Sequence, residues 1–255
     1  MRLDKLVADR GLARSRTAAA ALIRGGRVRV DDRVVERPSI MVGGQDHVVV
    51  DEDPYVSRAG HKLAGALAEL DLDVAGLRVL DAGASTGGFS QVLLRAGACE
   101  VIAVDVGHGQ LVDEIRDDPR VTTYERVNVR DLTLDHVDGR QVDLIVADLS
   151  FISLITVLPA LAGVVDAAGS LLLMVKPQFE VGRRRLDASG VVRDPLLHVE
   201  AVAGVANAGV ALGWYLQAVV PSRLPGPSGN REFFVHLAAT EPDAPVSVAA
   251  AVMTS

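Results

Sequence analysis

The sequence predicts an α/β fold whose main part is an open, mainly parallel sheet with an antiparallel closing strand. Three observations lead to this prediction. From residue 78 onward, short runs rich in Val, Ile and Leu alternate with helical segments, as in parallel sheets that are covered on both faces. A glycine-rich turn at residues 83–88 follows the first of these runs, which is typical of a Rossmann-like sheet. The first fifty residues show two short helices before alternating strands, and so predict a separate small α+β domain.

The N-terminal fifty residues are expected to form helices at 2–10 and 16–24 and strands at 27–30, 33–36 and 47–50. Ser15 is a suitable cap for the second helix, and Gly25-Gly26 ends it. An acidic stretch that includes Pro54 follows these strands. We therefore assign a first domain to residues 1–50 and a linker to residues 51–56.

The sheet domain is expected to cover residues 57–240. Its strands are expected at 78–80, 101–105, 121–125, 142–147, 171–176, 215–221 and 232–237. Its helices are expected to begin at Ser57, after Gly88, near Leu111, near Leu154 and at Asp194. The small apolar segment 241–255 is expected to be a flexible tail.

Charge is distributed unevenly along the chain. The net charge is −7, but residues 1–50 have a balance of +4 and residues 51–255 a balance of −11. A basic domain on an acidic body indicates contact with a nucleic acid, although a solvated helix face would also account for the charge. Guanidinium groups pair with phosphates, and the domain has no aromatic residue, so shape and phosphate contacts with folded RNA are favoured over base stacking. The candidate RNA-binding residues are Arg2, Lys5, Arg10, Arg14, Arg16, Arg24, Arg27 and Arg29.

The glycine-rich turn is a candidate cofactor site, because glycines let a backbone approach a ligand and a helix N-terminus offers free N–H groups. A dinucleotide site favours Gly-x-Gly-x-x-Gly, and Ser85 breaks that pattern. We expect the turn to bind the cationic S-adenosylmethionine beside Asp81, with Asp105 on the ribose hydroxyls; a purely structural turn is the alternative. The candidate cofactor residues are Asp81, Gly83, Ser85, Thr86, Gly87, Gly88, Phe89, Asp105 and Asn128.

Four further candidates lie at the ends of expected elements, where ligands gather in open α/β sheets. Lys62 lies on the helix before the first strand. Asp148 and Lys176 end strands, and Glu232 begins a closing strand. The chain has 23 arginines but only three lysines, and a lysine, unlike an arginine, can lose its proton and act as a base. Taken singly, each residue has a structural alternative, as a solvated surface residue, a helix cap, a strand-end ion pair or an edge-strand charge.

The motifs SRAGHKL, GASTGGF, ADLSFIS, VKPQFE and PGPSGNREFF together resemble those of the TlyA family of ribosomal RNA ribose methyltransferases, relatives of which are named hemolysins and whose catalytic domain is FtsJ-like. The run RLDKLVADRGLARSRTAAAALIRGGRVRVDDRVVERPS resembles the S-four-type RNA-binding domain. The resemblance implies a monomer that transfers a methyl group from S-adenosylmethionine to a cytidine ribose in small- or large-subunit ribosomal RNA. The family's Lys–Asp–Lys–Glu catalytic group falls on Lys62, Asp148, Lys176 and Glu232.

This chemistry suits the four residues. A ribose 2′-hydroxyl is a weak nucleophile, so a positioned base assists its attack. Lys176 is expected to accept this proton. Lys62 is expected to be a second cation whose charge favours the neutral form of Lys176, which can then act as the base. The two carboxylates are expected to orient the lysines and the hydroxyl.

Other function classes are a methyltransferase for tRNA or a small molecule, an inactive rRNA-binding or assembly factor, a cytolysin and a nicotinamide oxidoreductase. The basic domain disfavours a small-molecule substrate, and Ser85 disfavours a nicotinamide. No segment has the roughly 20 apolar residues of a membrane helix, and none resembles a signal peptide, so we expect a cytoplasmic protein without membrane contact. Cys99 is the only cysteine and the six histidines are scattered, so no metal site is expected.

Overall fold

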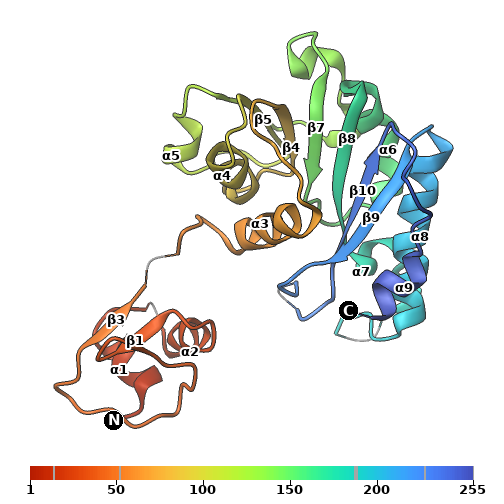
Figure 1. Cartoon of the computed structure of the whole chain (residues 1–255). Helices are drawn as coiled ribbons and strands as arrows, with labels where there is room; N and C mark the ends of the chain where they lie inside the picture. Colours follow the sequence, from red (N-terminus) through yellow and green to blue (C-terminus); the bar gives the residue numbers. More distant parts are fainter. Residues whose placement is uncertain (14, 52, 187–188, 227, 255) are drawn as a thin grey trace. The chain divides into compact units, whose positions relative to one another are not determined.

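The computed structural model describes residues 1–13, 15–51, 53–186, 189–226 and 228–254. These residues form two compact units, Met1–Pro54 and Tyr55–Ser255 (Figure 1). Each unit has hydrophobic clusters of its own. The division between the units falls inside segment 51–56, which we expected to be a linker. Arg14, a candidate RNA-binding residue, lies outside the described residues.

The first unit contains helices α1 (Leu3–Asp9) and α2 (Arg16–Arg24) and strands β1 (Val28–Val30), β2 (Arg33–Val34) and β3 (Val48–Val50). The strands form an antiparallel sheet in the order β2-β1-β3. Ser15 caps α2 by accepting a hydrogen bond from the Ala18 amide at 3.1 Å. Leu3 and Val7, one helical turn apart on α1, are fully buried with Ile23 of α2. The expected helices and strands are thus present, and β2 is two residues shorter than expected.

Within the described residues, the second unit is built on a seven-stranded sheet in the order β6-β5-β4-β7-β8-β10-β9. Its strands are β4 (Arg78–Ala82), β5 (Glu100–Asp105), β6 (Val121–Glu125), β7 (Val142–Ala147), β8 (Val165–Val175), β9 (Tyr215–Pro221) and β10 (Phe233–Ala238). The strands β4 to β8 pair in parallel, whereas β10 pairs antiparallel with both β8 and β9. A mainly parallel sheet with an antiparallel closing strand is therefore confirmed.

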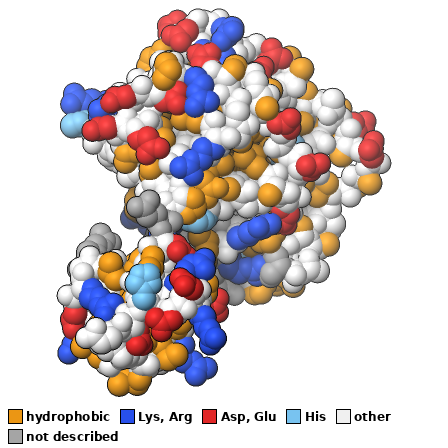
Figure 2. Space-filling model, turned by 60° about the vertical axis from the view of Figure 1, so that its left-hand side comes forward, with side chains coloured by type: hydrophobic (Ala, Val, Ile, Leu, Met, Phe, Trp, Pro, Cys, Tyr) orange, Lys and Arg blue, Asp and Glu red, His pale blue; other side chains and the backbone are white. Residues whose placement is uncertain are grey.

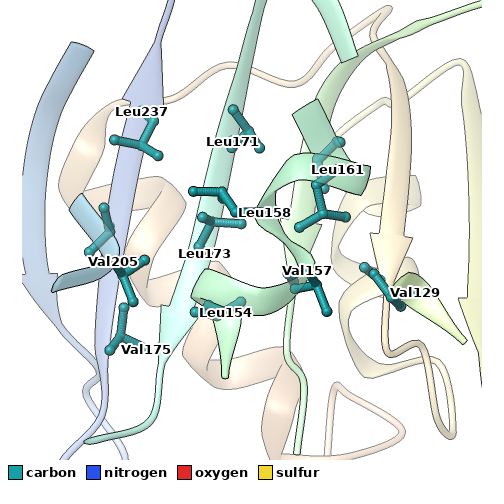
Figure 3. Packing of buried hydrophobic residues seen from close by; sticks show 14 of the residues in the cluster. Val129, Leu154, Val157, Leu158, Leu161, Leu171, Leu173, Val175, Val205 and Leu237 are labelled. Atoms are coloured by element: carbon teal, nitrogen blue, oxygen red, sulfur yellow. The ribbon is translucent and has the colours of Figure 1, made fainter. Parts of the chain in front are cut away.

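The helices of this unit are α3 (Arg58–Leu70), α4 (Gly88–Arg95), α5 (Asp113–Arg116), α6 (Leu154–Val164), α7 (Pro177–Glu180), α8 (Pro195–Ala211) and α9 (Val248–Met253), with 3-10 turns η1 (Val129–Asp131), η2 (Leu134–Val137) and η3 (Arg183–Arg185). Alternate residues of a strand face opposite sides of a sheet. On β8, Leu171, Leu173 and Val175 cluster with residues of α6 and α8 (Figure 3). Leu172 and Met174 cluster with residues of α3 and α4 instead. Helices therefore cover both faces of the sheet, which explains why its strands read as continuous apolar runs.

The C-terminal segment differs from the flexible tail that we expected over residues 241–255. Residues Val248–Met253 form α9, which packs against α8 and β9. Val252 is fully buried, and its carbonyl accepts a hydrogen bond from the Arg231 guanidinium at 3.3 Å. Because a single buried side chain in a short alanine-rich run gives no periodic pattern, the sequence did not predict this helix.

The strand order defines where the sheet can bind a ligand. The chain proceeds from β4 to β5 and β6 on one side, and then returns to β7 on the other side of β4. In open α/β sheets, ligands bind in the crevice at the carboxyl ends of the strands where the order reverses. The loops that emerge at this point are the glycine-rich turn after β4 and residues 148–153 after β7.

Candidate active site

Two adjoining cavities lie at the carboxyl ends of the parallel strands. The four candidate catalytic residues all line the first cavity, which has a volume of about 430 Å³. The second, of about 550 Å³, has Asp105 and Asn128 in its lining. The residues shared by the two cavities are Gly83, Ser85, Asp148 and Ser150. The cavities are thus parts of one cleft, which suits the transfer of a group between two ligands held side by side.

Lys62 and Glu232 form a buried ion pair in the first cavity. Lys62 comes from α3, and Glu232 immediately precedes β10. Lys62 Nζ lies 2.5 Å from Glu232 Oε2, and the two side chains are 8% and 1% exposed. A Cβ on Gly226 would lie 2.5 Å from Glu232 Oε1, so only glycine lets this loop close over the carboxylate. Pairing at this distance compensates part of the cost of removing both charges from water.

Lys176 and Asp148 form a second ion pair in the same cavity. They follow β8 and β7, neighbouring parallel strands whose carboxyl ends lie at one edge of the sheet. Lys176 Nζ lies 2.6 Å from Asp148 Oδ1, an ion pair rather than a well-aligned hydrogen bond, and donates to Ser150 Oγ at 2.9 Å. With side chains 11% and 15% exposed, this pair is more accessible than the first. Sequence reasoning had not selected Ser150, although it lies in the ADLSFIS motif.

The turn after β4 is shaped by glycines and by backbone donors. Gly83 has φ +91°, and a Cβ there would lie 2.7 Å from the Asp148 carbonyl oxygen. A Cβ on Gly88, the first residue of α4, would overlap with Ser57 Oγ. The candidate cofactor residues in the lining of the first cavity are Gly83, Ser85, Thr86, Gly88 and Phe89. The turn therefore brings open backbone to the cleft, as a ligand site requires.

Asp105 ends β5 with its carboxylate held by backbone amides. Its Oδ2 accepts from the Ser85 amide at 2.8 Å, and its Oδ1 accepts from the Gly107 amide at 2.7 Å. A carboxylate fixed in this way keeps further lone pairs available for ligand hydroxyls. Asn128 lies beside it, with its Oδ1 accepting from the Arg130 amide at 3.1 Å.

Asp81, which we expected beside the cationic ligand, has a side chain that does not reach the cleft. It lies in the middle of the sheet, is fully buried, and is absent from the lining of both cavities. Its Oδ2 accepts from Ser90 Oγ at 2.7 Å, and burial raises its pKa to about 7. Gly87 is likewise absent from both linings and serves as the left-handed N-cap of α4, with φ +97°. The structure thus gives these two residues positions behind the cleft.

A third cavity, of about 560 Å³, adjoins the first and shares Ser150, Lys176 and Glu232 with it. Phe151 and Phe179 line this cavity with their ring centroids 5.2 Å apart. Phe151 is 90% exposed and has φ +64°, a strained conformation for a residue other than glycine. Sequence reasoning missed both rings because a phenylalanine normally indicates core, whatever its neighbours in the chain.

Glu180 is a further residue that sequence reasoning missed. It ends α7, four residues after Lys176, and reaches the loop after β7. Its Oε2 accepts from Ser153 Oγ at 2.5 Å, and its Oε1 accepts from the Leu154 amide at 2.8 Å. Burial raises its pKa. One side chain thus ties together the two strand ends that carry Lys176 and Asp148.

The candidate RNA-binding residues of the first unit are largely engaged within it. Arg2 and Arg16 contact Asp4 with nitrogen–oxygen distances of 2.8 and 3.2 Å. The hydrogen bond from Arg2 is the main cause that lowers the pKa of Asp4 to about 2. Arg10 donates to two backbone carbonyls in the loop before β3.

Acidic residues of the expected linker engage two more candidates. Arg27 pairs with Asp53 at 2.6 Å, and Arg29 pairs with Asp51 at 3.1 Å. Including the three acidic residues at 51–53 lowers the charge balance of the first 54 residues to +1. On the face drawn in Figure 2, basic and acidic side chains are interspersed rather than separated.

Lys5 and Arg24 are exposed, and neither has an ion-pair partner within the described part of the chain. Arg33 and Arg37, which were not among the candidates, are exposed as well. Arg29 and Asp51 are both exposed, and an exposed ion pair is worth about 0–1 kcal/mol, so Arg29 can exchange this carboxylate for a phosphate at little cost.

Comparison with known protein families divides the chain in a similar way. An FtsJ-like methyltransferase model matches residues 55–239, and an S4 domain model matches residues 1–48. Across the described residues, no His, Cys, Asp and Glu side chains form a group of three suited to a metal ion. No helix in the described ranges is both long and apolar enough to cross a membrane.

Individual relatives resemble the chain over nearly its whole length. The 16S/23S rRNA (cytidine-2′-O)-methyltransferase TlyA of Mycobacterium tuberculosis is 51% identical over 239 residues, which are 92% of this chain and 89% of that protein. Hemolysin A of Brachyspira hyodysenteriae is 35% identical over 92% of this chain and 99% of its own length. The solved structure described as "Putative hemolysin from Streptococcus thermophilus" has a TM-score of 0.76 and 34% identity, covering 100% of this chain and 94% of that one.

Proposed function

Because the chain belongs to the TlyA family of FtsJ-like methyltransferases, we propose that it transfers a methyl group from S-adenosylmethionine to the 2′-oxygen of a cytidine ribose in ribosomal RNA. The relative from M. tuberculosis is named for this reaction on both 16S and 23S RNA. The S4 domain at residues 1–48 supports an RNA substrate. The partners would then be ribosomal subunits in the cytoplasm.

One observation carries the proposal. Two lysine–carboxylate pairs and most of the glycine-rich turn line one cavity, and the adjoining cavity contains Asp105. Methylation of a hydroxyl needs an acceptor, a methyl donor beside it and a base within reach of the hydroxyl proton. The cleft offers a separate place for each of these.

The second cavity fits S-adenosylmethionine, which when bound supplies an electrophilic methyl group on a sulfonium ion. Asp105 would accept hydrogen bonds from the ribose hydroxyls, since backbone amides already orient both of its oxygens. Asn128 would contact the adenine ring of S-adenosylmethionine, and Gly83 would leave its backbone open to this ligand. Asp81 would support the turn from behind rather than touch the ligand, because its side chain is fully buried.

The four charged residues would divide the remaining work. Lys176, once it has released its own proton and is a neutral amine, would take the proton from the 2′-hydroxyl, because it is the more accessible of the two lysines. Asp148 and Ser150 would hold its amino group in place. Lys62, fixed by Glu232, would provide a positive charge beside the 2′-oxygen while the 2′-hydroxyl loses its proton.

The proposal is tested by supplying methyl-labelled S-adenosylmethionine together with small subunits, large subunits or tRNA, and locating the label by nuclease digestion. We expect label on the 2′-oxygen of a cytidine in subunit RNA. Label on tRNA alone, label on a base, or no label despite measurable cofactor binding would each overturn the proposed substrate.

The role of Lys176 is tested with Lys176→Arg. This variant keeps the positive charge but cannot release its proton at working pH, so we expect at least a 100-fold loss of kcat, the lower range for a general base. Its affinity for S-adenosylmethionine and its thermal unfolding serve as controls and should match those of the wild type. Near-normal kcat would show that Lys176 is not the base.

A further inference from the structure

The turn η3 presents three consecutive arginines in a unit that is otherwise acidic. Residues 51–255 have a charge balance of −11, yet Arg183, Arg184 and Arg185 follow one another directly after α7. All three are exposed, and the turn has no buried residue. Neighbouring guanidinium groups add their positive potentials, and such a patch favours the approach of an anionic partner.

The three arginines differ in whether a carboxylate of the same chain already pairs with them. Arg185 makes a two-pronged ion pair with Glu200, with Nη2 and Oε2 2.6 Å apart. Arg183 and Arg184 have no carboxylate partner within the described residues. They are therefore the members of the run that remain available to an external anion.

The position of Arg183 indicates which anion this is. Arg183 lines the third cavity, which also contains Lys176 and Glu232 of the candidate active site. Gly182, beside it, has φ +82° and open space where a Cβ would be, so the rim of the cavity is unobstructed there. A strand of RNA whose ribose reaches Lys176 must pass its neighbouring phosphates over an adjoining surface, and the third cavity is such a surface.

We propose that Arg183 and Arg184 bind phosphates of the RNA strand that carries the modified ribose. This inference rests on the proposed function and adds a second RNA contact, in the methyltransferase unit itself. Guanidinium groups suit this role because they pair with phosphate through two parallel N–H donors. The contact would hold the reacting strand, whereas the S4 domain would bind RNA elsewhere.

The test compares full-length R183A/R184A with the wild type and with R185A as a matched control. R185A removes a cation from the same turn, but one that Glu200 already neutralises. We measure the affinity for intact subunits and for protein-free ribosomal RNA at several salt concentrations, and the KM of methylation. Two lost phosphate contacts on a single strand should reduce the slope of log affinity against log salt by about 1.4.

We expect R183A/R184A to weaken RNA affinity and raise KM about 10-fold near 150 mM salt. Its kcat and its affinity for S-adenosylmethionine should stay within about twofold of the wild type, and R185A should match the wild type throughout. R183K/R184K should recover the salt slope, since lysine keeps the charge, but only part of the affinity.

Equal behaviour of R183A/R184A and R185A would overturn the proposal. An effect seen with intact subunits but not with protein-free RNA would also overturn it, because the partner would then be an acidic protein surface. If the wild type methylates none of the RNAs, the proposed function fails by itself. The binding slopes then still decide whether these two arginines contact phosphate.

Discussion

Two ion pairs of nearly equal length in the candidate active site differ in their burial. Lys62–Glu232 spans 2.5 Å with side chains 8% and 1% exposed, and Lys176–Asp148 spans 2.6 Å with side chains 11% and 15% exposed. A buried charge that loses its partner is costly, whereas a charge near water can be solvated. The first pair should therefore matter more to the stability of the fold.

Glu232→Gln should lower the free energy of unfolding by about 3 kcal/mol, because it leaves the Lys62 ammonium buried beside a neutral amide. Asp148→Asn should cost less, since Lys176 keeps its hydrogen bond to Ser150 and is closer to solvent. Chemical denaturation at pH 7 measures both. Lys62→Met combined with Glu232→Gln should recover part of the loss, and an Asp148→Asn variant as unstable as Glu232→Gln would contradict this ranking.

Asp81 makes the stability of the second unit depend on pH. Its pKa is raised to about 7, first by burial and further by the nearby charges of Asp148 and Asp105, while the hydrogen bond from Ser90 opposes the shift. In the unfolded chain a carboxyl group has a pKa near 3.9. Between these two values the folded state binds the proton more tightly, so stability falls as the pH rises from about 4 to about 7.

Asp81→Asn should remove this dependence, because the amide does not ionise. The difference in unfolding free energy between the variant and the wild type should change by a value on the order of 4 kcal/mol between pH 4 and pH 8, in favour of the variant at the higher pH. Denaturation curves at the two pH values give this difference directly. A difference that does not change with pH would show that Asp81 is not the group responsible.

Among single residues, the sequence points to site candidates where a residue type is rare in the chain or unexpected at its position in an element. Lys62 and Lys176 could be predicted because lysine is rare in this chain, and Asp105 because an acidic residue ends an apolar strand. Ser150 and Glu180 could not, because a serine in a loop and a glutamate in a short helix are ordinary. Their importance comes from contacts with residues 26 positions away in the chain.

At the scale of elements, Glu180 links α7 to α6. Its carboxylate accepts from both the backbone and the side chain at the start of α6, and so caps that helix. Because α7 follows Lys176 directly and the loop before α6 carries Asp148, the cap fixes the separation of the two strand ends. Glu180 is therefore a positioning residue that acts through its neighbours.

Glu180→Ala should lower kcat about 10-fold and the free energy of unfolding by about 1–2 kcal/mol, the usual cost of a lost cap. Its affinity for S-adenosylmethionine should change less than twofold, because the second cavity does not include this residue. Glu180→Gln can still accept from the Leu154 amide and should recover most of both losses. If Glu180→Gln is as impaired as Glu180→Ala, the negative charge rather than the cap is what matters.

The elements were predicted well where many residues share a pattern. Most strands of the sheet are short apolar runs, so their number and order along the chain followed from the sequence. The start of β8 was missed, because residues 165–170 are mostly small or polar and follow α6 without a turn signal. Helix α9 was missed for a related reason, since its sequence holds only one fully buried side chain.

At the scale of the whole molecule, the chain consists of two units with separate cores. The apolar cluster of the first unit draws its buried residues from positions 3–48, and those of the second unit from positions 63–252. The sequence indicated a first domain at residues 1–50 through its two helices, its alternating strands and the acidic stretch after them. It overestimated the basic character of the first unit, because Asp51 and Asp53 fold back onto Arg29 and Arg27.

The division predicts that residues 55–255 fold without the first unit. A chain that starts at Tyr55 should bind S-adenosylmethionine within about twofold of the full-length protein. Its KM for ribosomal subunits should rise roughly 100-fold, since the phosphate contacts of the S4 domain are lost. Isothermal titration and the methylation assay measure the two effects. An unchanged KM would mean that the first unit does not contribute to RNA binding.

The starting residue of this fragment is critical, because Tyr55 and Val56 belong to the second unit. The Tyr55 ring packs against Gly60 and lies under the Arg95 guanidinium, 5.6 Å from the ring centroid. The Val56 amide donates to the buried Gln91 Oε1 at 2.9 Å. A fragment that starts at Ser57 should thus be about 2 kcal/mol less stable than one that starts at Tyr55. Equal stability of the two fragments would place the boundary of the folded unit after Val56 instead.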